Sequence, residues 1–235
     1  EAPAVQRHLA RGRDAGARYA GVEASSHGRD MHRVDECAFD VGVFINLTPD
    51  HLDYHGTMER YRDAKATLFR MLGAAPDKGV PRAAILNADD AASAYMRAQT
   101  RVPAMTYGLL TPADFAASAI AVDAEGTRFD AAYRDVRASA RMTLLGAYNA
   151  SNALAAVAVA VSQGVDFTVA VAALASFRGV QGRMEVIVEG QPFRVVVDIA
   201  STEQAMRNVL SVLRPATPGK LIVVFGAAGE RDRER

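Results

Sequence analysis

The chain has 235 residues and no net charge, because 27 lysines and arginines balance 27 aspartates and glutamates. Half of the residues are hydrophobic, which is enough for a buried core and compatible with one large domain or one and a half. The balanced charge gives no broad basic field for nucleic acid or an anionic membrane surface. Composition therefore indicates an ordinary globular protein without a nucleic-acid partner.

The single cysteine, Cys37, excludes an internal disulfide framework and favours an intracellular, cytoplasmic location. No apolar stretch is long enough to span a bilayer, and residues 1–14 lack the apolar core of a signal peptide. The first residue is not Met, and the chain stops in GERDRER directly after a strand-like run. We therefore expect a fragment of a longer protein, without membrane insertion.

The hydrophobic pattern of the first 108 residues alternates between helices and strands. Residues 40–47 (DVGVFINL) form the nearly unbroken apolar run that is typical of a parallel strand buried on both faces. The alternation predicts an α/β fold with a wound, mostly parallel sheet and with catalytic groups at the carboxyl ends of its strands. The expected helices are 4–17, 58–72 and 90–99, and the expected strands are 19–25, 40–47, 83–89 and 104–108.

The second half of the chain changes character twice. Short alternating runs over residues 117–146 predict a small antiparallel sheet beside the main one, and helices follow it. After FRGVQGRMEVI a new βαβ unit is expected, the start of a Rossmann-like domain. We place the boundary so that residues 1–186 form a central domain and residues 187–235 begin a second one. The remaining expected elements are helices 148–163, 167–177 and 202–214 and strands 193–200 and 220–229.

Residues 46–65 (NLTPDHLDYHGTMERYRDAK) concentrate ionisable side chains where a strand gives way to a helix. Lys65 lies on the apolar face of that helix, and a buried ammonium is costly unless it is paired, reaches solvent or is chemically altered. One interpretation is that the lysine stem packs while its head reaches Asp63 or Glu59. The apolar face itself is formed by Tyr61, Ala64, Leu68, Phe69 and Leu72.

His51 and His55 stand four residues apart, which on a helix would be the spacing of a zinc pair. Pro49 instead favours a loop for His51, and no third nitrogen or sulfur ligand is evident. Oxygen ligands dominate the neighbourhood, which favours magnesium. Glu23 would reach the same sheet edge as His51 if their strands are neighbours, or it is simply a charge at a strand end.

Six runs of residues together resemble the Mur ligase family, in its UDP-N-acetylmuramoyl-tripeptide synthetase branch. Their order and spacing carry the resemblance, and the combination of DHLDYHG with a later AK is far more specific than any single run. The runs span nearly the whole chain. They are VEASSHGRDMHRVD, FDVGVFINLTPDHLDYHGTMERYRDAKATLF, ILNADD, LLGAYNASNALAA, FRGVQGRMEV and VVFGAAGERD.

The resemblance implies the central, ATP-binding domain of a Mur ligase followed by the beginning of its C-terminal domain. It implies an ATP-dependent amide ligase of peptidoglycan synthesis, and hence of cell-wall biogenesis, cell shape and cell division. ATP would phosphorylate the carboxylate of UDP-MurNAc-L-Ala-D-Glu, and the amine of meso-diaminopimelate or L-lysine would displace the phosphate. The implied partners are these three small molecules, and we expect a monomer.

Five residues of the first half take roles by this resemblance. Glu23 and His51 would hold Mg²⁺ at the γ-phosphate of ATP. Lys65 would carry a carbamate made from carbon dioxide, which turns a problematic buried cation into an anion that supports the magnesium. Ser25 and Arg33 would bind the UDP-MurNAc-peptide, an anionic substrate that suits a guanidinium.

Four residues of the second half match nucleotide-binding positions of the family. Asn149 and Asn152 are spaced to share a helical face, and the match gives Asn152 to the adenine; alternatively, Asn149 caps the first turn of the helix. Arg183 would reach the ATP phosphates, and Asp198 would meet the ribose. An arginine and an aspartate beside a domain boundary could equally form a structural ion pair.

The chain departs from the family pattern in several places, including Met31, which stands where a polar residue is common. The phosphate-binding loop, of the type G-x-x-G-K-T/S, would lie upstream of residue 1, so residues 1–235 alone should bind ATP poorly and should not catalyse. Residues 198–204 read DIASTEQ where D-Y-A-H-T-P-D is usual. Two alternatives therefore stay open: a related ligase of the folylpolyglutamate type, and a non-catalytic descendant that binds a UDP-sugar.

Overall fold

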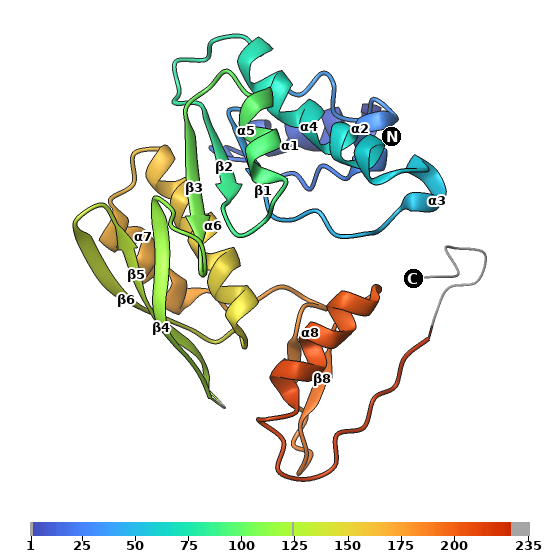
Figure 1. Ribbon diagram of the computed structural model, residues 1–235, viewed down its shortest axis with the longest axis vertical. Coiled ribbons are helices and arrows are strands. Elements are labelled where there is room, and N and C mark those ends of the chain that lie inside the picture. The colour runs from blue at the N-terminus through green and yellow to red at the C-terminus, as the bar shows by residue number, and fades with distance from the viewer. Residues whose placement is uncertain (1, 124, 227–235) are drawn as a thin grey trace. The chain divides into compact units, whose positions relative to one another are not determined.

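The computed structural model describes residues 2–123 and 125–226 of the chain (Figure 1). It divides into two compact units, residues 1–105 and residues 106–235. One six-stranded sheet runs in the order β1-β2-β3-β4-β5-β6, and the boundary between the units falls inside β3. The predicted α/β class is confirmed, while a domain boundary near residue 186 stays a prediction. No helix in the described part of the chain has the length and apolar character needed to cross a membrane.

The first unit is built around the parallel pair β1 and β2. In this pair Val41 lies opposite Ala83 and Phe44 opposite Leu86. Parallel strands need a long crossover, and helix α4 provides it. The elements of this unit are α1 (Ala2–Asp14), α2 (Ser26–Asp30), β1 (Val41–Phe44), α3 (Leu52–His55), α4 (Met58–Ala74), β2 (Ala83–Asn87), α5 (Ser93–Gln99) and the start of β3 (Ala104–Gly108).

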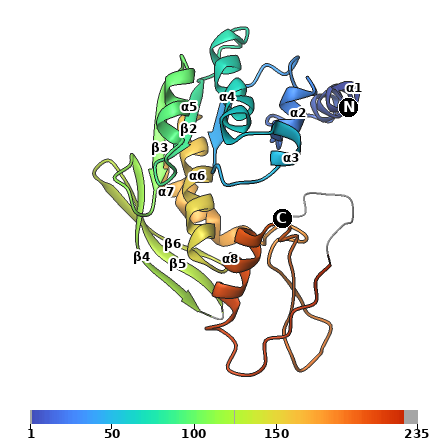
Figure 2. The same cartoon turned by 45° about the vertical axis from the view of Figure 1, so that its right-hand side comes forward.

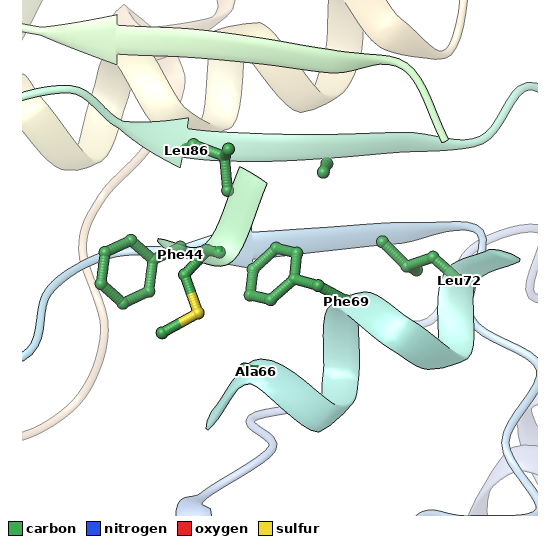
Figure 3. Close-up of a cluster of buried hydrophobic side chains, with 7 residues drawn as sticks. Phe44, Ala66, Phe69, Leu72 and Leu86 are labelled. Atoms are coloured by element: carbon green, nitrogen blue, oxygen red, sulfur yellow. The ribbon is translucent and has the colours of Figure 1, made fainter. Parts of the chain in front are cut away.

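The core of the first unit lies between α4 and the two parallel strands. Phe44 of β1 and Leu86 of β2 are buried against Ala66, Phe69 and Leu72 of α4 (Figure 3). The rings of Phe44 and Phe69 meet edge to face, with centroids 6.5 Å apart. The apolar face predicted for this helix is therefore the face that packs against the sheet.

The strand predicted at residues 19–25 is wrong. This segment, which carries Glu23, has no strand hydrogen bonding. A strand exists only where a neighbouring strand supplies its hydrogen bonds, and in the described sheet β1 stands at the end of the order and pairs with β2 alone. An apolar run without such a neighbour stays irregular.

In the second unit, helices α6 and α7 cover one face of the antiparallel strands β4, β5 and β6 (Figure 2). The antiparallel sheet predicted for residues 117–146 is thus present, but it continues the main sheet, because Tyr107 of β3 pairs in parallel with Phe115 of β4. This part of the second unit contains β4 (Phe115–Asp123), β5 (Gly126–Tyr133), β6 (Val136–Met142), α6 (Ala147–Ser162), α7 (Phe167–Ala173) and a 3₁₀ turn (Leu174–Ser176).

The last described segment contains the antiparallel pair β7 (Glu185–Ile187) and β8 (Val195–Val197) and the helix α8 (Glu203–Leu213). The predicted helix is confirmed, but the strand predicted at 220–229 is wrong as far as the described residues reach. Residues 220–226 have no strand pairing, since the described partner of β8 is β7 and not a parallel strand. Residues 227–229 of this strand, and residues 227–232 of the VVFGAAGERD run, lie outside the described residues.

Leu72 offers a test of the core of the first unit. Its side chain is completely buried, whereas Leu110 is 90% exposed. Leu72→Ala should lower the free energy of unfolding by about 2–5 kcal/mol, because it removes buried methyl groups and leaves a cavity. Leu110→Ala, the same substitution on the surface, should change it by less than about 0.5 kcal/mol. Urea unfolding followed by far-UV circular dichroism measures both, and equal losses would contradict this description of the core.

Candidate functional site

The loop after β1 delivers His51 to the carboxyl end of the strand. His51 adopts a left-handed backbone conformation (φ 57°) and immediately precedes α3. Its backbone N–H donates to Asp50 Oδ1 at 2.9 Å, and its Nε2 lies 3.3 Å from Asp50 Oδ2. His51 therefore sits in a loop, as Pro49 predicts, and does not share a helix with His55 as a zinc pair would require. Across the described residues, no three His, Cys, Asp or Glu side chains come together as a metal-binding group.

Lys65 is half-buried on α4, as the helical pattern predicts. Its Nζ lies 5.0 Å from the ring centroid of Tyr61, and no carboxylate of a described residue comes within 4.0 Å of it. Burial lowers the pKa of the Lys65 ammonium, and the negative charges of Asp50, Asp90 and Glu23 oppose that shift. The lysine thus lies among three carboxylates without forming an ion pair with any of them.

The two carboxylates first suggested as partners of Lys65 have other roles. Asp63 accepts a hydrogen bond from the Tyr95 hydroxyl. Glu59 lies in the first turn of α4, where backbone N–H donation and the Thr57 hydroxyl lower the pKa of its carboxyl. The simple ion-pair explanation of Lys65 is therefore wrong for both residues.

The two candidate substrate-binding residues, Ser25 and Arg33, flank helix α2. Ser25 caps the helix, and its hydroxyl accepts a hydrogen bond from the Gly28 N–H at 3.1 Å. Arg33 is half-buried: its Nη2 lies 3.3 Å from Met31 Sδ, and its Nε is buried without a hydrogen-bond partner among the described residues. A buried guanidinium donor without a partner calls for an explanation, and an anionic ligand is one.

Polar side chains fasten α2 to α3 and α4. The buried pair Ser26 and His55 makes a 2.9 Å hydrogen bond between Oγ and Nε2. The Tyr54 hydroxyl donates to Asp30 at 2.7 Å. The buried Arg29 donates to the Thr67 hydroxyl of α4 at 2.9 Å and to Asp35 at 3.2 Å. The ring of His27 contacts three other rings, with centroid distances of 4.6 Å to His51, 4.1 Å to Tyr54 and 5.4 Å to His55.

Sequence reasoning missed three residues of this site: Ser26, His27 and Asp90. The signal for the first two was present, because they stand inside the SSHG run that also contains Ser25. Asp90 ends the ILNADD run, which was recognised as a motif without a role for its aspartates. Glu23, the predicted metal ligand, is exposed in an irregular segment and acts electrostatically on Lys65.

In the second unit, Asn149 and Asn152 share a face of α6, as predicted. The Asn152 amide donates to Asn149 Oδ1 at 3.2 Å, and the buried Asn149 amide donates to the Leu145 carbonyl at 2.9 Å. Asn149 does not cap the helix: Gly146 occupies the cap position with φ 105°, and its N–H donates to the buried Thr127 hydroxyl at 2.9 Å. The alternative role suggested for Asn149 is therefore wrong, and Asn152 is left exposed.

Arg183 and Asp198 are not an ion pair in the part of the chain that the structure describes. Asp198 accepts a hydrogen bond from the Met184 N–H at 2.8 Å, and the Arg183 side chain is exposed. Tyr148, at the start of α6, lies close enough to Asp198 that burial first and this carboxylate second raise the pKa of its hydroxyl. Asp198 and the start of α6 thus face one another within the second unit.

Comparison with known protein families gives two matches along the chain. Residues 1–160 match the Mur ligase middle domain, and residues 182–235 match the Mur ligase glutamate ligase domain. The chain belongs to the Mur ligase family. The resemblance inferred from the six sequence runs is therefore confirmed.

Relatives of this Mur ligase chain point to one branch of the family. A UDP-N-acetylmuramoyl-L-alanyl-D-glutamate--2,6-diaminopimelate ligase of Bacillus velezensis is 43% identical over 91% of this chain and 44% of its own length. A UDP-N-acetylmuramyl-tripeptide synthetase of Roseiflexus sp. (strain RS-1) is 42% identical over 100% of this chain and 48% of its own length. A solved structure of a diaminopimelate ligase of this type has a TM-score of 0.74 at 33% identity, covering 94% of this chain and 45% of that chain. The chain thus spans less than half the length of the relatives it matches.

His55 makes the stability of this Mur ligase chain depend on pH. Burial first, and the nearby His27 second, lower the pKa of His55 below its ordinary value of 6.5. Below about pH 6.5 the unfolded chain is protonated at His55 more readily than the folded chain. The free energy of unfolding therefore falls as the pH drops from about 6.5 toward the lowered pKa of the folded state. We expect the urea midpoint to fall less between pH 7 and pH 5 in His55→Gln than in the unmodified protein. His8→Gln, on an exposed position of α1, controls for losing a histidine; an unchanged pH dependence in His55→Gln would contradict the prediction.

Proposed function

We propose that this chain is the central part of an ATP-dependent amide ligase that adds a diamino acid to UDP-MurNAc-L-Ala-D-Glu in peptidoglycan synthesis. The observation that carries the proposal is the half-buried Lys65, which lies among three carboxylates and beside the loop that contains His51. The names of the relatives favour 2,6-diaminopimelate as the amino acid that is added. Membership of the Mur ligase family supports the proposal. The activity belongs to whole proteins of which this chain corresponds to less than half.

The reaction joins two anions and then an amine. A carboxylate oxygen of the UDP-MurNAc-peptide attacks the γ-phosphorus of ATP, the bond to the bridging oxygen breaks, and ADP leaves. The amine of the diamino acid then attacks the acyl carbon. The bond between that carbon and the phosphate oxygen breaks, phosphate leaves, and the amine loses a proton. Positive charge and fixed positions are what such a site must supply, because phosphoryl transfer depends mainly on orientation and electrostatic stabilisation.

The residues present suit a bound magnesium ion. Magnesium takes oxygen ligands, often only one or two from the protein together with water and phosphate oxygens, so a site without three clustered protein ligands is compatible with it. Glu23 and His51 would hold the ion, and it would neutralise charge on the ATP phosphates. The charge of Glu23 acts on Lys65, and this supports Glu23 as one of the two ligands.

Lys65 would act as a carbamate. The neutral amine attacks carbon dioxide, a nitrogen–carbon bond forms, and a proton leaves, so the cation becomes an anion that supports the magnesium ligands. Burial favours this chemistry because it lowers the pKa of the ammonium and so increases the fraction of neutral amine. The absence of an ion pair within 4.0 Å of Lys65 among the described residues leaves the head of the side chain without a competing carboxylate contact.

Each unit carries its own candidate binding side chains. Arg33, with its unpartnered Nε, would bind an anionic group of the UDP-MurNAc-peptide, and Ser25 would contribute its hydroxyl. In the second unit, the exposed Asn152 amide would meet the adenine, Arg183 the phosphates and Asp198 the ribose. Asn149 would position Asn152 through their mutual hydrogen bond.

The ligase assay tests the function. Protein from the complete gene should release phosphate from ATP only with UDP-MurNAc-L-Ala-D-Glu, Mg²⁺ and a diamino acid present. Lys65→Ala should lower kcat by about 10²- to 10³-fold, because it removes a group that organises the charge around the phosphoryl group. Lys78→Ala controls for the loss of a lysine. Lys78 lies in the loop between α4 and β2, and its Nζ pairs with Asp40 at 2.7 Å.

Phosphate release that does not depend on the diamino acid would argue against the ligase. Binding of the UDP-sugar without any turnover would favour the non-catalytic alternative. Full activity of Lys65→Ala would remove this lysine from the mechanism.

The carbamate has a direct spectroscopic test. With ¹³C-bicarbonate near pH 8 and Mg²⁺ present, the protein should show a ¹³C carbamate resonance that is absent in Lys65→Arg. The signal should weaken when Mg²⁺ is removed, because an added anion among the three carboxylates near Lys65 is stabilised by a nearby cation. The 235-residue chain has three lysines, so in that chain the Lys78→Arg and Lys220→Arg variants, which should keep the resonance, complete the assignment. An unmodified Lys65 with bicarbonate and Mg²⁺ both present would refute the carbamate.

A further inference from the structure

The ILNADD run has no role in the function proposed so far, yet it ends at the same sheet edge as the His51 loop. β2 is parallel to β1, so the segments after Phe44 and after Asn87 leave the sheet at the same edge. We propose that Asp90 is a positioning residue of the site: its carboxylate holds the segment between β1 and His51 in place beside Lys65. This inference rests on the proposed function.

Both oxygens of the Asp90 carboxylate hold backbone amides. Oδ2 accepts a hydrogen bond from the Leu47 N–H at 2.7 Å, across 43 residues of sequence. Oδ1 accepts from the Ala92 N–H at 2.8 Å, within its own turn. Hydrogen bonds to a charged acceptor are about twice as strong as neutral ones, so the carboxylate joins the β1 exit to the β2 exit by a strong and directional link.

A second side chain reinforces the same link. The Asn87 amide donates to the Ile45 carbonyl at 2.8 Å, and its Oδ1 accepts from the Asp89 N–H at 3.0 Å. The backbone pairing of β1 with β2 ends at Phe44 and Leu86. Beyond that point the side chains of Asn87 and Asp90 replace the backbone hydrogen bonds between the strands. They bind the backbone of Ile45 and Leu47, which lies just before Asp50 and His51.

Asp90 also lies near the other half of the site. Its charge acts on Lys65 of α4, together with the charges of Asp50 and Glu23. One carboxylate therefore contacts the segment that leads to His51 and lies within electrostatic reach of Lys65. Because a misplacement of about 1 Å can cost about 100-fold in rate, loss of this link should reduce catalysis through the position of the His51 loop.

Amide hydrogen exchange measured by NMR tests the link without any activity. In Asp90→Ala the Leu47 amide should exchange at least about tenfold faster, because it loses its acceptor, while the amides of Val43 and Phe44 in β1 should keep their protection. Asp90→Asn keeps the size of the side chain but replaces the charged acceptor by a neutral one, which weakens the hydrogen bond to the Leu47 N–H. Exchange at Leu47 should therefore also become faster in Asp90→Asn, which serves as the second variant if Asp90→Ala does not fold. Unchanged Leu47 protection in a folded variant would overturn the link.

Ligase kinetics with the protein from the complete gene test the positioning role. Asp90→Asn should lower kcat by about 10- to 100-fold, the usual range for a residue that orients metal ligands, and leave KM for UDP-MurNAc-L-Ala-D-Glu within about twofold. Asp77→Asn is the matched control: this carboxylate also accepts a turn amide, from Gly79 at 2.9 Å, but it precedes β2 at the opposite edge of the sheet. Equal kcat values in Asp90→Asn and the unmodified protein would overturn the proposal, as would equal losses in the Asp90 and Asp77 variants.

The two experiments distinguish a failure of the proposed ligase function from a failure of the positioning role of Asp90. If the unmodified protein has no ligase activity but Leu47 loses protection in Asp90→Asn, the link stands and the ligase assignment fails. If the unmodified protein is active and Asp90→Asn is equally active, the ligase stands and the positioning role of Asp90 fails.

Discussion

A half-buried lysine on the packing face of α4 is the constraint around which the first unit is organised. The helix must bury Ala66, Phe69 and Leu72 against β1 and β2, and Lys65 immediately precedes this apolar stripe. Its ammonium loses hydration and gains no direct ion pair within 4.0 Å from the described residues, and only the longer-range charges of three carboxylates compensate. Burial and these charges act in opposite directions on the pKa of the ammonium, so the protonation of Lys65 depends on its surroundings.

The polar residues around this lysine come from separate segments, and side-chain hydrogen bonds hold those segments together. Asp90 joins the exits of β1 and β2, while Ser26 and His55 join α2 to α3. Arg29 joins α2 to α4 through the Thr67 hydroxyl. Irregular backbone at the end of a sheet has no ladder to fix it, so these links supply the rigidity that catalytic positioning requires. These links hold α2, which Ser25 and Arg33 flank, together with α3, which the candidate metal ligand His51 immediately precedes.

The hydrophobic pattern of the sequence correctly predicted β1 and α4. The apolar run of β1 and the helical spacing of α4 were sufficient to place both, and to place Lys65 on the inner face. Segments 19–25 and 220–226 look equally strand-like, but a strand depends on a neighbour that sequence does not reveal. Asn149 failed as a cap because Gly146, with φ 105°, begins the helix three residues earlier. Asp90 was missed because its contact with Leu47 spans 43 residues, a separation that periodicity cannot detect.

Charge balance links the two least ordinary parts of the proposed mechanism. Three carboxylates act on Lys65, and they stabilise its ammonium form. A carbamate at the same position would add a fourth negative charge to this group, which burial would make more costly still. In the proposed mechanism a divalent cation held by Glu23 and His51 would reverse that balance, because it would add two positive charges beside the carbamate. The proposed carbamate would therefore depend on the proposed magnesium ion, while burial, which lowers the pKa of Lys65, would increase the fraction of neutral amine from which the carbamate forms.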